Sequence, residues 1–187
     1  MASGTDALQF LHPGSPIPTT AMRTAVALGS NIGDRLENLR AARKAIFGLS
    51  NVTPPILSSA VYETEPVDCE LGAGKFLNAV IEFEYEGDPA SLLEHIIRIE
   101  AALGRKRDHP KDVSRTIDSD LLYCGSQQID NERLQLPHPR MHVRKFVLQP
   151  LADIGPNLIL PGRAKSIREL LGEVEQSGEV VRFAAEW

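Results

Sequence analysis

The sequence predicts an α+β fold, with a ferredoxin-like β-α-β-β-α-β core, an antiparallel sheet and a C-terminal extension. Three observations indicate it. Apolar and polar residues alternate over 76–85, as in a strand with one buried face. Apolar residues recur at helical spacing over 34–47 and again over 88–103. Short strand-like runs flank both helices, and the resulting order is that of the split βαβ arrangement.

Turn and capping residues set the limits of these elements. Asn31 or Ser30 can cap the first helix, Asp88 or Ser91 can cap the second, and Gly104 can end it. The expected core elements are a strand at 24–28, a helix at 34–47, strands at 56–62 and 76–85, a helix at 88–103 and a strand at 117–123.

The residues after this strand, 124–187, form the expected C-terminal extension. We expect a turn at 125–131, an extended segment at 134–139 and short helices at 147–154 and 166–175. Both core helices should cover one face of the sheet. The extension, or the loops at 63–75 and 105–114, must then cover the other face.

Length and composition are those of one soluble globular domain. Of 187 residues, 42% are hydrophobic and 24% are charged. We expect residues 1–22, rich in Pro, Ser, Thr and Gly, to be a disordered leader, and residues 23–187 to be a single domain. The sequence has no apolar run of about 18 residues, the length needed to span a membrane. Cys69 and Cys124 are far apart, which favours reduced thiols and a cytoplasmic protein.

Charge is unevenly distributed along the chain. The net charge of -5 argues against a protein that coats nucleic acid or an anionic membrane. Basic residues nevertheless cluster in 98–115 and in 133–145, and the second segment contains no acidic residue. An anionic small molecule would explain these clusters, and so would a solvated basic surface.

Asp118 and Asp120 begin the last core strand. Residues two apart in a strand point to the same face, so the two carboxylates should stand side by side, with Ser119 on the opposite face. Such a pair repels itself unless a cation neutralises it, and Mg²⁺ prefers oxygen ligands. The alternative is a solvent-facing strand end whose carboxylates pair with Arg or Lys. The turn at 29–33 lies between a strand and a helix, where it could bind an anion; the alternative is a tight turn that needs small residues. The sequence contains no P-loop motif.

Seven short motifs, in this order and spacing, resemble those of the 6-hydroxymethyl-7,8-dihydropterin pyrophosphokinase family, enzymes of folate synthesis. The motifs are Gly-Ser-Asn at 29–31, Tyr-Glu-Thr-Glu-Pro at 62–66, Phe-Leu-Asn-Ala at 76–79, Arg-Ile-Glu at 98–100 with Gly-Arg-Lys-Arg at 104–107, Arg-Thr-Ile-Asp-Ser-Asp at 115–120, Pro-His-Pro-Arg-Met at 137–141 and Arg-Lys-Phe-Val-Leu at 144–148. The resemblance covers about residues 24–161, and the family has a ferredoxin-like core.

The resemblance implies the transfer of pyrophosphate from ATP to the hydroxymethyl oxygen of the pterin, with two Mg²⁺ bound by Asp118 and Asp120. The implied catalytic residues are Asp118, Asp120, Arg105, Arg107 and Arg115. The implied ATP-binding residues are Glu100, Arg107, Arg115, Leu121, Arg133, His138 and Arg144. The implied pterin-binding residues are Thr64, Glu65, Val67, Phe76, Asn78 and Phe146. We expect a monomer whose partners are ATP and the pterin.

The chain departs from the family pattern at two places. The family usually approaches its aspartates through Trp-x-Pro-Arg, where this chain has Asp-Val-Ser-Arg at 112–115, and it usually has Leu where this chain has Ser119. A buried hydroxyl at Ser119 needs a hydrogen-bond partner. Neither change removes an aspartate or an arginine. The alternatives are another Mg²⁺-dependent nucleotide-using transferase and a non-catalytic ferredoxin-like domain that binds a small molecule.

Overall fold

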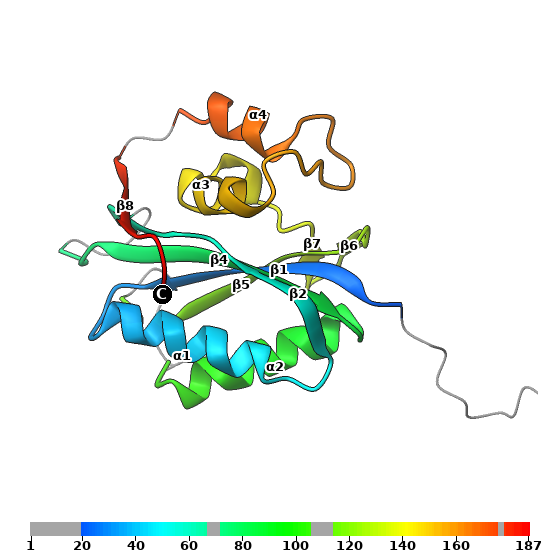
Figure 1. Cartoon of the computed structure of the whole chain (residues 1–187), viewed down its shortest axis with the longest axis horizontal. Coiled ribbons are helices and arrows are strands. Elements are labelled where there is room, and N and C mark those ends of the chain that lie inside the picture. The colour runs from blue at the N-terminus through cyan, green and yellow to red at the C-terminus, as the bar shows by residue number, and fades with distance from the viewer. Residues whose placement is uncertain (1–19, 67–71, 106–113, 176–177) are drawn as a thin grey trace, which may run out of the picture.

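In the computed structural model, a six-stranded antiparallel sheet lies between two pairs of helices (Figure 1). The structure describes residues 20–66, 72–105, 114–175 and 178–187. The main sheet contains β1 (Met22–Ser30), β2 (Val52–Ser58), β3 (Val61–Thr64), β4 (Phe76–Tyr85), β5 (Asp118–Cys124) and β8 (Val180–Ala184). The helices are α1 (Arg35–Phe47), α2 (Pro89–Ala102), α3 (Lys145–Ile154) and α4 (Ile167–Glu173). The α+β fold class is confirmed.

Two hydrophobic cores lie on the two faces of the sheet. β1 lies between β4 and β5 and pairs with both over most of its length. Alternation along β1 sends Val26 and Leu28 into the core beneath α1 and α2, and Ala25 into the core beneath α3 and α4. As expected, both early helices cover one face and the C-terminal extension covers the other (Figure 1). None of the described helices is long and apolar enough to cross a membrane.

A bulge in β5 redirects its side chains. Leu121 pairs with Val26 of β1 and Tyr123 pairs with Ala25, which leaves Leu122 as an extra residue. Leu121 therefore packs in the core of α1 and α2, while Leu122 and Tyr123 both pack in the core of α3 and α4. The polar end of β5, which holds the two aspartates, precedes this bulge.

Several expected boundaries were wrong. The strand expected at 56–62 is two strands, because Ser59 leaves the ladder: its Oγ accepts a hydrogen bond from the Val80 amide, and the next amide, of Ala60, donates to Asp153 of α3. Asp34, not Asn31 or Ser30, caps α1 by accepting from the Glu37 amide.

Elements of the extension also differ from those expected. Two strands of two residues each, β6 (Ile129–Asp130) and β7 (Gln135–Leu136), form a small hairpin. A 3-10 helix, η1, covers Met141–Val143. The expected helix at 166–175 is shorter, with Ser166 as its cap. β8 was not expected, and it extends the sheet beside β3.

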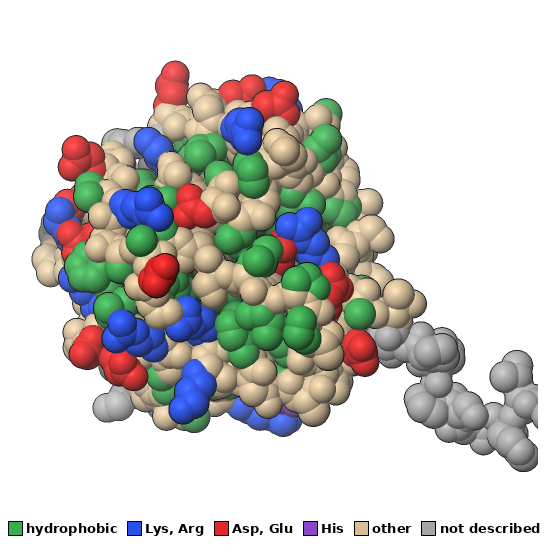
Figure 2. All heavy atoms as spheres, in the orientation of Figure 1, with side chains coloured by type: hydrophobic (Ala, Val, Ile, Leu, Met, Phe, Trp, Pro, Cys, Tyr) green, Lys and Arg blue, Asp and Glu red, His purple; other side chains and the backbone are tan. Residues whose placement is uncertain are grey.

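β2 forms an edge of the sheet and carries exposed apolar side chains. Ile56 and Leu57 are about 40% exposed, and Figure 2 shows a hydrophobic patch over this strand. Pro54 and Pro55 precede them and have no N–H to offer a neighbouring strand. Prolines at this position oppose edge-to-edge pairing with another chain.

A buried carboxylate ties three strands together within the core of α3 and α4. Glu82 of β4 is only 3% exposed. It pairs with Arg23 of β1 at 2.6 Å and accepts a hydrogen bond from the Tyr123 hydroxyl of β5. Burial, and then the neighbouring Glu82, raise the pKa of Tyr123, so its hydroxyl remains a donor.

We expect Arg23→Gln to lower the free energy of unfolding by about 1–3 kcal/mol, because Glu82 keeps its burial and loses its cation. Urea denaturation at pH 7 measures the change. Arg40→Gln is the matched control, since the Arg40 pair with Glu37 at 3.7 Å is exposed and should contribute less than about 0.5 kcal/mol. Equal stability of both variants would show that the buried pair is not stabilising.

Candidate active site

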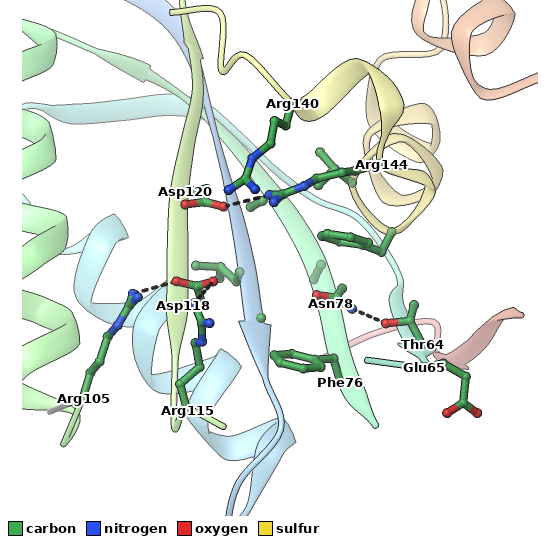
Figure 3. A pocket seen from close by; sticks show the side chains of 16 residues that line it. Thr64, Glu65, Phe76, Asn78, Arg105, Arg115, Asp118, Asp120, Arg140 and Arg144 are labelled. Carbon is green, nitrogen blue, oxygen red and sulfur yellow. Dashed lines mark hydrogen bonds and ion pairs between the residues drawn. The ribbon is translucent and has the colours of Figure 1, made fainter. Parts of the chain in front are cut away.

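One cavity opens on the α3 and α4 face, above β1, β4 and β5 and beside the N-terminus of α3 (Figure 3). It combines carboxylates, arginines, an amide and aromatic rings. Its lining residues are Ala27, Leu28, Gly29, Thr64, Glu65, Phe76, Asn78, Ala79, Arg105, Arg115, Asp118, Asp120, Arg140, Arg144, Phe146 and Val147.

Asp118 and Asp120 lie on the same face of β5 and line this cavity. Two arginines bind Asp118: Arg105 Nη1 lies 2.7 Å from Oδ1, and Arg115 Nη1 lies 2.8 Å from Oδ2. Ser119, between the aspartates, faces the opposite core, as expected. Its buried hydroxyl has no hydrogen-bond partner among the described residues.

Asp120 is less well compensated than Asp118. Among the described residues, its ion pair is with Arg144, whose Nη1 lies 3.8 Å from Asp120 Oδ2. Burial, and then repulsion from Asp118, raise its pKa to about 6. A carboxylate pair of this kind is stabilised by a divalent cation, whose charge favours ionisation of both groups.

The donor set fits Mg²⁺ better than a metal that requires a full protein cage. Among the described residues, no group of three or more His, Cys, Asp or Glu side chains could hold a metal ion. Mg²⁺ commonly takes one or two carboxylates and completes its coordination with water and substrate phosphates. Asp118 and Asp120 meet that requirement.

Glu100 lies beneath the cavity rather than in its lining. It is 3% exposed, and it accepts a hydrogen bond from the Ser119 amide at 2.7 Å. Burial raises the pKa of Glu100. Its carboxylate also pairs with Arg105, so Arg105 connects Glu100 to Asp118. The structure therefore places Glu100 behind an arginine of the site.

Asn31 positions the segment that carries Arg115. Its side-chain Oδ1 accepts a hydrogen bond from the backbone N–H of Arg115 at 2.7 Å. Its backbone N–H donates a hydrogen bond to the Arg115 carbonyl at 3.2 Å. Asn31 Nδ2 also donates to the Ser114 hydroxyl at 3.1 Å. The turn after β1 therefore positions an arginine segment, and the Asn31 N–H is used for that purpose.

The other end of the cavity is suited to a flat ligand with a polar edge. Asn78 of β4 is buried, and its Nδ2 donates to Thr64 Oγ1 at 2.7 Å. An amide has a second N–H and a carbonyl oxygen, which remain for a ligand. Phe76 and Phe146 also line the cavity, and both are only half-buried.

Gly29 leaves room at the centre of the cavity floor. It pairs with Asn78 on one side and with Asp118 on the other. A Cβ atom at this position would lie 3.1 Å from Asn78 Oδ1 and 3.8 Å from Phe76. A side chain here would crowd the two residues that define the aromatic end.

A second cavity lies beyond the aspartates and contains the remaining expected ATP-binding residues. Leu121, Arg133 and His138 line it, and none of the three lines the first cavity. Arg133 is exposed and pairs with Glu94 at 3.0 Å. Arg107 and Val67, also expected at the site, lie outside the described residues.

His138 is neutral at physiological pH. Burial, followed by the charges of Arg144 and Arg140, lowers its pKa to about 4. Its Nδ1 accepts a hydrogen bond from the Arg140 amide at 3.2 Å, so the neutral ring carries its proton on Nε2. That N–H can donate to a ligand in the second cavity.

Residues 25–156 match the family described as 7,8-dihydro-6-hydroxymethylpterin-pyrophosphokinase. The chain belongs to this family. A 2-amino-4-hydroxy-6-hydroxymethyldihydropteridine pyrophosphokinase of Haemophilus influenzae is 41% identical over 146 residues, which are 78% of this chain and 89% of that protein. The Bacillus subtilis enzyme of the same name is 45% identical over 129 residues, 69% of this chain and 75% of its own.

Solved structures with larger chains share the fold. A Plasmodium falciparum HPPK-DHPS with pterin and p-hydroxybenzoate has a TM-score of 0.64 and 16% identity, over 83% of this chain and 43% of that one. An HPPK-DHPS in complex with substrates gives 0.65 and 14%, again over 83% and 43%. This chain thus spans less than half the length of those chains.

Sequence reasoning did not name two residues that line this cavity, Arg140 and Gly29, as site residues. Arg140 stood in the basic cluster 133–145 and in the motif at 137–141, but neither could show which arginines turn inward. Gly29 stood in the turn at 29–33 and in the motif at 29–31, but it received no role, because its place in the cavity floor depends on pairing with two distant strands.

We expect Asp120→Asn to stabilise the ligand-free protein at pH 8 by about 1 kcal/mol, reduced from the full pKa difference because the side chain is partly exposed. A folded-state pKa above the unfolded value of about 3.9 means that Asp120 favours folding when protonated and loses that contribution as pH rises through about 6. The gain should therefore vanish near pH 4.

Urea denaturation at pH 4, 6 and 8 measures this dependence. Glu175→Gln, at an exposed carboxylate after α4, should change stability little at any of these pH values. A destabilised Asp120→Asn variant at pH 8 would contradict the assignment of Asp120 as a strained carboxylate.

Proposed function

We propose that the cavity between β5 and α3 is the active site in which this chain joins ATP to a reduced pterin. As a family member, the chain is an ATP-dependent pyrophosphokinase of folate biosynthesis. The single observation that supports the site is the lining itself: a carboxylate pair and arginines at one end, and an amide between half-buried aromatic residues at the other. These are the groups that the two substrates require.

The reaction exchanges one bond to the β-phosphorus of ATP for another. The pterin hydroxymethyl oxygen forms a bond to that phosphorus and loses its proton to water. The bond to the bridging oxygen of the α-phosphate breaks, and that oxygen leaves with AMP. Such a transfer depends on alignment and charge neutralisation more than on a covalent intermediate of the enzyme.

We propose that Asp118 and Asp120 hold two Mg²⁺ ions, which would neutralise charge on the triphosphate when bound. Arg105 and Arg115 already lie against Asp118, and their guanidinium groups can turn to phosphate oxygens. Glu100 keeps Arg105 in place from below.

The remaining residues would orient the two ligands. Asn78 and Thr64 would bind the polar edge of the pterin, with Phe76 and Phe146 against its faces and Glu65 at the rim. Neutral His138 would donate from Nε2 to the nucleoside in the second cavity, beside Leu121 and Arg133. Arg144 would lie between the two ends.

We also propose that residues 23–187 act as one domain, as a monomer, in the cytoplasm. All described strands but the small β6–β7 hairpin share one sheet, which supports a single domain. Cys124 is a buried free thiol, as expected in a reducing compartment.

A chromatographic assay with ATP, Mg²⁺ and 6-hydroxymethyl-7,8-dihydropterin tests the proposal. We expect AMP to form only when the pterin and metal are both present. ADP would indicate an ordinary kinase instead. Ligand binding without turnover and without metal dependence would favour a non-catalytic binding domain.

We expect Asp118→Ala and Asp120→Ala to abolish AMP formation while the protein remains folded, because each change removes a metal ligand and also a like-charge repulsion. The same assay gives the rate, and circular dichroism checks the fold. Glu175→Gln serves as the control. Unchanged turnover in both Ala variants would refute the metal assignment.

We expect Asn78→Ala to weaken pterin binding about tenfold or more and to change ATP binding by less than about twofold, since the lost amide groups lie at the aromatic end only. Calorimetric titration of each ligand measures the two effects. Thr64→Val, which removes only the amide's partner, should cause a smaller loss of pterin affinity. Equal losses for pterin and ATP in Asn78→Ala would contradict the pocket assignment.

A further inference from the structure

Arg140 lies where the two cavities meet. Among the described residues it alone lines both: the first with Asp118 and Asp120, and the second with His138. Figure 3 shows the Arg140 and Arg144 side chains together above Asp120. A ligand that occupies both cavities must therefore pass Arg140.

The guanidinium group of Arg140 has no ion pair within the described parts of the chain. Every other arginine in the first cavity contacts a carboxylate there: Arg105 and Arg115 contact Asp118, and Arg144 contacts Asp120. Arg140 therefore contributes a positive charge that no carboxylate of the described residues neutralises through an ion pair. An anionic group of the ligand would neutralise it.

The backbone fixes the position of Arg140. Its amide donates to His138 Nδ1 at 3.2 Å, and its carbonyl accepts from the Val143 amide at 3.3 Å. The next residue, Met141, is 1% exposed and anchors this turn in the core of α3 and α4. The exposed arginine thus extends from a fixed point, which reduces the entropy lost when it binds a ligand.

We infer that Arg140 binds the α-phosphate of ATP and of the product AMP. This inference rests on the proposed function, with the nucleoside beside His138 and the β-phosphorus beside Asp118 and Asp120. The α-phosphate is the only phosphate attached to the nucleoside, so it must lie at the junction between them. Arg140 then also stabilises the leaving group, because the bridging oxygen retained by AMP gains negative charge as its bond to the β-phosphorus breaks.

The test is the binding of AMP, ATP with Mg²⁺, and adenosine to Arg140→Gln. Loss of a charge-assisted hydrogen bond should weaken AMP and ATP by a similar factor, about 10- to 100-fold. Adenosine, which has no phosphate, should bind within about twofold of the wild-type protein. kcat for AMP formation should also fall, while pterin affinity is unchanged.

Two further variants keep the result interpretable. Arg140→Lys retains the charge without the planar fork and should lose less affinity than Arg140→Gln. Arg163→Gln is the matched control: Arg163 lies beside η1, with Nη2 3.1 Å from His142 Nδ1, and it lines neither cavity. It should bind all three ligands as the wild-type protein does.

Three results would overturn the inference. Unchanged AMP affinity in Arg140→Gln would remove the α-phosphate contact, even if ATP binding fell. An equal loss of adenosine would show that Arg140 contacts the nucleoside or only shapes the turn, and unchanged affinity for every ligand would exclude Arg140 from the site. Failure of the proposed function is distinguishable, because the wild-type protein itself would then form no AMP from ATP and the pterin.

Discussion

The site depends on the repulsion between two carboxylates that strand geometry forces onto one face. Asp118 and Asp120 cannot turn away from each other while β5 stays paired with β1. The protein compensates with arginines from three separate segments: Arg105 after α2, Arg115 before β5 and Arg144 before α3. The carboxylate pair therefore constrains where each of those segments can lie.

The two faces of the sheet have different tasks. The core beneath α1 and α2 is the larger of the two clusters of buried apolar residues. On the other face, α3 and α4 leave part of the sheet uncovered, and polar side chains line the cavity there. Among them, the negative charge of Asp120 is only partly compensated by Arg144. Glu100 and Ser119 are buried polar residues on the side of α1 and α2, and both adjoin Asp118 through the backbone of β5 or through Arg105. The apolar core on one face thus offsets the unfavourable burial and repulsion of the carboxylates on the other.

Local pattern predicted the elements whose sequence and tertiary roles agree. β4 matches the expected strand at 76–85, and Asp88 caps α2 as one of two candidates. The pattern failed where distant contacts decide. Ser59 interrupts the strand expected at 56–62, where its Oγ accepts a hydrogen bond from the Val80 amide, and β8 pairs with β3, which is distant in sequence. Neither contact leaves a periodic signal in its own segment.

The site was predictable as a set of residues and not as an arrangement. The motifs identified the aspartates, Asn78 and most of the arginines. They implied the same role, ATP binding, for both Glu100 and His138. The structure separates them: Glu100 is sealed beneath Arg105, and His138 lines an open cavity. In the ligand-free protein, two of the site's arginines are already bound to Asp118. If these arginines bind ATP as proposed, they would exchange a carboxylate partner for phosphate partners, and Asp118 would be left uncompensated unless a cation arrives with the nucleotide. The charge arrangement thus favours binding of ATP together with its metal over binding of ATP alone.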